Sequence, residues 1–180
     1  MSDKLQRSFQ ERNFFVRTLV LTVVALLLAV VFNFAPSASE DFSTPVTPLG
    51  YLTMTLYLGV WFYCAAVAGK NGYKSFAVYG GCYWILSLVF ILCINLSILT
   101  GLNLADLAII GLFLIYVPLY GLVYQFQNTF QMDYLFAFIL LILLLVLVYT
   151  TGYRKFARLA RDDAILARAA EEDEEPENQV

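Results

Sequence analysis

Residues 134–153 read YLFAFILLILLLVLVYTTGY, a run of 20 residues without a charged side chain. A helix of this length rises about 30 Å, which matches the hydrocarbon thickness of a bilayer. Four further apolar segments of comparable length precede it, at 18–34, 49–69, 76–100 and 104–124. The sequence therefore predicts an all-α fold, a polytopic integral membrane helical bundle with five apolar helical segments.

The composition agrees with a membrane protein and excludes several other classes. Of the 180 residues, 61% are hydrophobic and 14% are charged, whereas soluble domains have roughly 45–50% apolar and about 25% charged residues. Without a histidine in the chain, His-based triads, H-E-x-x-H zinc sites and axial haem ligation are excluded. Cys64, Cys82 and Cys93 form no C-x-x-C pair. We expect no enzymatic activity, no metal, no cofactor and no nucleic-acid partner.

The charges divide the chain into four regions. Residues 1–17 form a basic amphipathic N-terminal segment, and residues 18–153 form the transmembrane helical domain. The start resembles a secretory signal peptide, but its apolar run exceeds the usual 7–15 or so residues, and we expect an uncleaved helix. Residues 154–170 are expected to extend the last segment as a basic amphipathic helix, either along the membrane surface or as a solvated flank. Residues 171–180 are expected to form an acidic disordered tail.

The basic residues give conflicting information about orientation. All 11 Lys and Arg residues lie in the amino-terminal segment, at Lys70 and Lys74, or between Arg154 and Arg168. The positive-inside rule places all three clusters in the cytoplasm, which requires an even number of crossings between Lys74 and Arg154. Three apolar segments occupy that interval, however. The alternatives are five crossings with an external carboxyl tail, a re-entrant or interfacial fourth segment helped by Pro118, and insertion in both orientations.

The first two alternatives both place the amino terminus in the cytoplasm, and we expect the protein to reside in the plasma membrane. Between the second and third segments, Asn71-Gly72 is a tight-turn signal that predicts an antiparallel helical hairpin. Two pairs of small residues, Ala65-x-x-x-Gly69 and Ala77-x-x-x-Gly81, favour close approach of helices.

Asp106 and Asn95 are the candidate polar residues inside the membrane. Asp106 is the only acid within an apolar segment, and an intramembrane carboxylate is a candidate proton or cation site. It also follows Asn103 by three residues, where an acid stabilises the start of a helix, and we prefer this capping interpretation. Asn95 can hydrogen-bond across helices, and we prefer that role to ligand contact.

An aromatic stripe follows one face of the fourth segment. Phe113, Tyr116, Tyr120 and Tyr124 recur at helical spacing. This stripe can line a cavity for an apolar ligand, or it can pack in the core and form an interfacial belt, which is the interpretation that we favour.

Two functional hypotheses follow from these features. The first is a non-enzymatic accessory or scaffold subunit that acts through helix–helix contacts, with the lipid bilayer and a membrane protein or a second copy as partners. The alternative is a small transporter or channel subunit, whose pathway uses Asp106, Asn95, Tyr116 and Tyr120.

Overall fold

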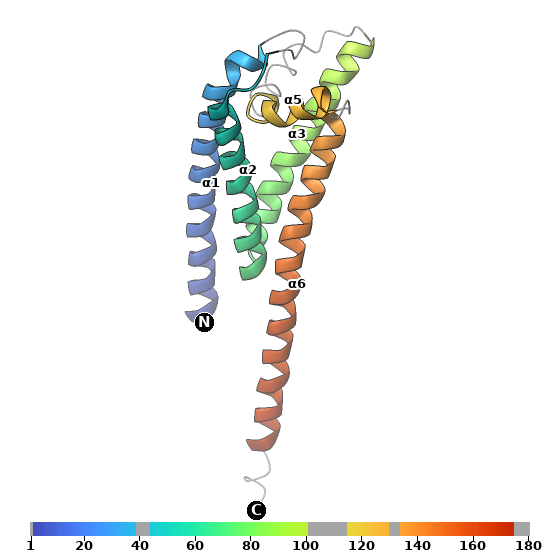
Figure 1. Cartoon of the computed structure of the whole chain (residues 1–180). Coiled ribbons are helices and arrows are strands. Elements are labelled where there is room, and N and C mark those ends of the chain that lie inside the picture. The colour runs from blue at the N-terminus through green and yellow to red at the C-terminus, as the bar shows by residue number, and fades with distance from the viewer. Residues whose placement is uncertain (1, 39–43, 101–114, 130–133, 175–180) are drawn as a thin grey trace, which may run out of the picture.

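The structure is a computed structural model that describes residues 2–38, 44–100, 115–129 and 134–174. Within these ranges the side chains of 2–4, 94, 95, 97–100, 134 and 167–174 lie outside the description. The described residues form helices, turns and short connections, without a strand (Figure 1). The prediction of an all-helical bundle is confirmed.

Four of the described helices are long and apolar enough to cross a membrane. The described helices are α1 (Ser2–Ser37), α2 (Pro48–Asn71), α3 (Lys74–Thr100), α5 (Tyr120–Asn128) and α6 (Tyr134–Glu174). The candidate spans lie in α1, α2, α3 and α6. The prediction of five such segments is therefore wrong in the described part of the chain, where the fourth segment does not supply a span.

The fourth predicted segment, 104–124, is interrupted. Its residues 104–114 lie outside the described part of the chain. The backbone turns at Val117–Leu119, and α5 then runs across the end of the bundle (Figure 1). Pro118 lies in this turn, where the missing N–H and the fixed φ of proline disfavour a continuous helix. The nine residues of α5 rise only about 13 Å, so α5 is too short to cross a bilayer.

Although the uncharged polar residues at 125–132 resemble a connector in sequence, α5 continues to Asn128. A tertiary contact accounts for the difference. The side-chain amide of Gln125 donates to the hydroxyl of Tyr51 on α2 at 2.6 Å. This bond holds a polar stretch of sequence against the bundle in helical form.

The bounds of α2 follow from the residues at its two ends. The Thr47 hydroxyl accepts a hydrogen bond from the Gly50 N–H at 3.0 Å, and Pro48 begins the helix where its missing N–H costs nothing. The helix ends at Gly72, whose φ of 66° is left-handed and therefore favours glycine. The Tyr73 N–H closes the cap on the Ala68 carbonyl at 2.9 Å. The predicted turn at Asn71-Gly72 is confirmed.

Helix α2 lies between α1 and α6 and supplies much of the core (Figure 1). Tyr57, Trp61, Cys64 and Ala68 on this helix are almost completely buried. The outer faces of α1, α3 and α6 instead expose many Leu, Val and Ile side chains. Large apolar side chains thus cover much of the outer surface of the bundle, as suits a helix assembly surrounded by lipid.

Two glycines bring the backbones of α2 and α6 together. A Cβ atom on Gly152 would lie 2.9 Å from the backbone carbon of Gly69, and one on Gly69 would overlap the carbonyl oxygen of Tyr149. The close approach predicted for Ala65-x-x-x-Gly69 is thus confirmed at Gly69. No helix in the described part of this chain approaches Gly81, where a Cβ atom would meet nothing within 4 Å.

The three basic clusters gather at one end of the bundle. The start of α1, the α2–α3 turn and the last part of α6 lie on the same side in Figure 1. The Arg7 guanidinium lies 4.9 Å from the centre of the Phe156 ring, and the Tyr149 hydroxyl donates to the Tyr73 carbonyl at 3.3 Å. Among the described residues, two candidate spans, those of α3 and α6, lie between the Lys70/Lys74 cluster and Arg154, and this is the even number that the positive-inside rule requires.

Candidate functional site

The structure describes only part of the predicted site. Asp106 lies outside the described residues, and Asn95 belongs to α3 with its side chain outside the description. Tyr116 and Tyr120 are buried beside each other, with ring centroids 6.0 Å apart. The Tyr120 hydroxyl donates to the Thr44 carbonyl at 3.1 Å. These two tyrosines therefore contribute to packing around α5, and their placement relative to the two polar candidates lies outside the described part of the chain.

Two pairs of hydroxyl groups form hydrogen bonds between described helices inside the bundle. The Thr22 and Tyr79 hydroxyls are 2.8 Å apart and join α1 to α3. The Tyr57 and Tyr83 hydroxyls are 2.6 Å apart and join α2 to α3. In hydrocarbon, such bonds satisfy groups that would otherwise be costly to bury. They hold α3 in place against the two neighbouring helices.

Trp61 lies at the centre of an aromatic cluster. Its ring stacks on Tyr79 at 5.6 Å and on Tyr83 at 4.9 Å between centroids, while Trp84 meets it edge-on at 5.4 Å. Offset and edge-to-face pairs contribute about 0.5–1.5 kcal/mol each beyond their burial. The cluster lies on the same part of α3 as both hydroxyl pairs, so packing and hydrogen bonding reinforce each other.

Sequence reasoning missed Asn33, which is completely buried near the end of α1. Its side-chain amide donates to the Ala29 carbonyl at 3.0 Å and to the Gly50 carbonyl of α2 at 3.2 Å. The sequence signal that could have identified it is a side-chain amide within the predominantly apolar segment 18–34. This residue joins the opposite end of α1 to the start of α2.

An apolar groove of about 420 Å³ lies between α2, α3 and α6 within their membrane-spanning parts. Small residues form part of its lining, with Ala65 from α2 and Ala77, Gly80 and Gly81 from α3. The remaining lining residues are large and apolar or aromatic: Trp61, Phe76, Trp84, Ile85, Ile142, Leu145, Val146 and Tyr149.

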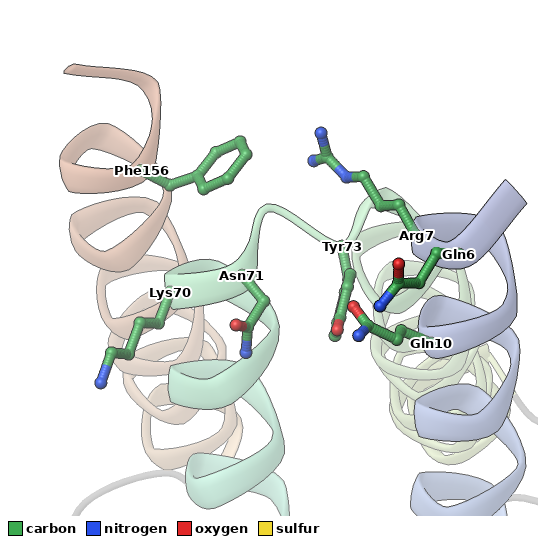
Figure 2. Close-up of a pocket in the computed structure, with 7 residues that line it drawn as sticks. All are labelled: Gln6, Arg7, Gln10, Lys70, Asn71, Tyr73 and Phe156. Carbon is green, nitrogen blue, oxygen red and sulfur yellow. The ribbon is translucent and has the colours of Figure 1, made fainter. Parts of the chain in front are cut away.

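A second, polar pocket of about 390 Å³ lies at the basic end of the bundle, as Figure 2 shows. Helix α1 contributes three of its side chains, α2 and the following turn contribute three, and α6 contributes one. They are Gln6, Arg7, Gln10, Lys70, Asn71, Tyr73 and Phe156. The pocket combines two cations and three amides with two aromatic rings, so it is suited to a polar or anionic group.

In the described part of the chain, no three His, Cys, Asp or Glu side chains gather to form a metal site. Comparisons with known proteins identify no relative: no family model matches the chain, and neither a curated protein nor a solved structure resembles it significantly. The groove, the polar pocket and the hydrogen-bonded core are therefore the features of the molecule that indicate a function.

Proposed function

We propose that this chain is a non-enzymatic, multi-pass membrane protein that acts as an accessory or scaffold subunit through helix–helix contacts. The observation that carries the proposal is the apolar groove between α2, α3 and α6. It lies within helices that are long and apolar enough to span a bilayer. Its proposed occupant is a transmembrane helix of a partner protein.

Small residues give the groove the form that helix association in lipid requires. Lipid tails are as apolar as leucine, so helices associate where small side chains let their backbones pack closely. Ala77 is exposed at the groove, and space is open around the Cα of Gly81. Ile85, an exposed residue, extends the same surface of α3 and supplies contact area.

The polar core supports a structural role more than a transport role. The hydroxyls of Thr22 and Tyr57 are bonded to tyrosines of α3, and the Asn33 amide is bonded to α2. These groups hold the bundle together. The transporter alternative depends on Asp106 and Asn95. It predicts that Asp106→Asn abolishes flux in reconstituted vesicles while the protein remains folded.

The same proposal includes an orientation with both ends of the chain in the cytoplasm and the plasma membrane as its location. The gathering of all three basic clusters at one end of the bundle supports this orientation through the positive-inside rule. The turn between α2 and α3 carries Lys70 and Lys74 to that same end.

Site-specific photo-cross-linking in the native membrane tests the scaffold function. A photoreactive residue at Ile85, which lies at the groove and is 66% exposed, should give a discrete protein adduct. The same probe at Val31 on the outer face of α1, 68% exposed, should give only lipid adducts. Gly81→Leu should fill the groove and remove the Ile85 adduct without unfolding the protein, because no neighbour lies near that position. An Ile85 adduct that is absent, or that persists in Gly81→Leu, would contradict the proposal.

A further inference from the structure

We propose that the polar pocket of Figure 2 binds the phosphate group of an anionic phospholipid. The pocket lies where α1, the end of α2 and α6 meet, and residues from all three helices line it. It is separate from the groove proposed for a partner helix, since the two have no lining residue in common.

The side chains of the pocket supply the donors that a phosphate group requires. Arg7 presents a planar guanidinium that matches two phosphate oxygens, and the Lys70 ammonium is a mobile point charge. The amides of Gln6 and Gln10 extend from α1 on the same side as Arg7 (Figure 2). These neutral donors can complete the hydrogen bonding of a bound oxyanion without adding charge.

Aromatic contact holds Arg7 at the pocket. Its guanidinium carbon lies 4.9 Å from the centre of the Phe156 ring, within the range of a cation–π interaction. The guanidinium of Arg7 and the ring of Phe156 face each other across the pocket in Figure 2. The Lys70 side chain extends away from Arg7 in that view, but it is exposed, and exposed side chains change rotamer within nanoseconds. Arg7 is thus positioned in advance, and Lys70 can join it.

One of the two acids that lie four residues from Arg7 in the sequence, Glu11, is already engaged. Glu11 lies one turn along α1 from Arg7, and its Oε1 atom accepts a hydrogen bond from the Ser75 N–H at 2.9 Å. That bond directs the carboxylate toward the start of α3. The positive charge of Arg7 therefore remains available to an external anion, although Glu11 reduces it in part.

The position of the pocket favours a lipid, rather than a free phosphate ion, as the source of the phosphate group. Lys70 and Asn71 are the last residues of the α2 span, so the pocket lies at the level where the hydrocarbon ends and headgroups begin. Tyr73 and Phe156 line it, and aromatic residues concentrate at this interface. Basic pockets between transmembrane helices on the cytoplasmic side are known headgroup sites. A free phosphate ion would provide the same chemistry without the acyl chains.

Native mass spectrometry of the full chain in a neutral detergent tests the proposal. The protein is titrated with phosphatidylglycerol and, separately, with zwitterionic phosphatidylcholine. We expect preferential binding of phosphatidylglycerol. Arg7→Gln and Lys70→Gln should each weaken this binding about fivefold, the effect of removing one cation near an anionic lipid. Lys70→Arg should retain the affinity.

Matched controls distinguish lipid binding in the pocket from a general attraction of anionic lipid to basic residues. Arg158→Gln removes the same charge from an exposed position of α6 outside the pocket, and it should leave the affinity unchanged. An equal loss in Arg158→Gln, or equal binding of both lipids, would overturn the proposal. An excess of inorganic phosphate should not displace the lipid. Displacement by inorganic phosphate would overturn the assignment to a lipid. Unchanged thermal unfolding of each variant shows that the loss concerns binding.

Discussion

Adding one methyl group at Gly69 tests the contact between α2 and α6. A Cβ atom at this position would overlap the Tyr149 carbonyl oxygen, and the atoms around it also belong to the backbone of α6. Backbone atoms of two packed helices cannot rotate away as the end of a flexible side chain can. Overpacking of this kind typically costs about 1–3 kcal/mol. Gly69→Ala should therefore reduce the free energy of unfolding, although alanine favours the helix itself by up to about 1 kcal/mol.

Gly59→Ala provides the matched control on the same helix. A Cβ atom at Gly59 would meet nothing within 4 Å. Both substitutions gain the same intrinsic helix propensity, so the difference between them isolates the overpacking cost. We expect Gly69→Ala to be less stable than Gly59→Ala by about 1–3 kcal/mol.

Equilibrium unfolding in mixed micelles, with neutral detergent replaced stepwise by sodium dodecyl sulfate, measures this difference. Tryptophan fluorescence reports on the transition, because Trp61 and Trp84 lie in the core. Gly152→Ala should behave like Gly69→Ala, since its Cβ atom would approach the backbone of Gly69. Equal stability of Gly69→Ala and Gly59→Ala would refute the close approach of α2 and α6.

Three further predictions concern other contacts. In a double-mutant cycle of Thr22→Val and Tyr79→Phe, the two losses in unfolding free energy should be coupled by about 0.6 kcal/mol through the shared hydrogen bond. Additive losses would contradict that bond. Glu11→Gln should destabilise the bundle by about 0.3–1 kcal/mol at low salt, because a carboxylate near the start of α3 favours the helix dipole. High salt should abolish the difference, and no loss at low salt would refute it. Reporter fusions at both ends of the chain should localise to one side of the membrane and labels at residues 44–47 to the other. Ends on opposite sides would exclude four crossings.

The sequence predicted the helices whose signal is local. The run at 134–153 and the three earlier apolar segments lack charges over a bilayer's thickness, and this property requires no knowledge of neighbouring helices. They correspond to α6, α1, α2 and α3 in the structure. The turn at Gly72 was also predictable, because a left-handed residue after a helix favours glycine.

The sequence did not predict the features that depend on distant contacts. Helix α5 includes polar residues that resemble a loop, and it is held by the bond between Gln125 and Tyr51. Hydropathy alone counts the fourth segment as a span, and only the re-entrant or interfacial alternative, which relied on Pro118, anticipated the turn there. The polar pocket combines α1, the α2–α3 turn and Phe156, which no periodicity in the sequence connects. Of the four predicted site residues, the structure describes the side chains of Tyr116 and Tyr120, and both are buried.

The length of α6 has a mechanical consequence. The helix contains 41 residues and therefore measures about 61 Å, about twice the hydrocarbon thickness. It continues without a visible bend past the end of α2 (Figure 1), and the part that follows Tyr153 amounts to about 30 Å. A straight helix of this length fixes the distance between the membrane and the far end of α6. A protein bound to that end would lie at a fixed distance from the membrane surface. A lateral force on that end would exert a torque on the glycine contact between α2 and α6.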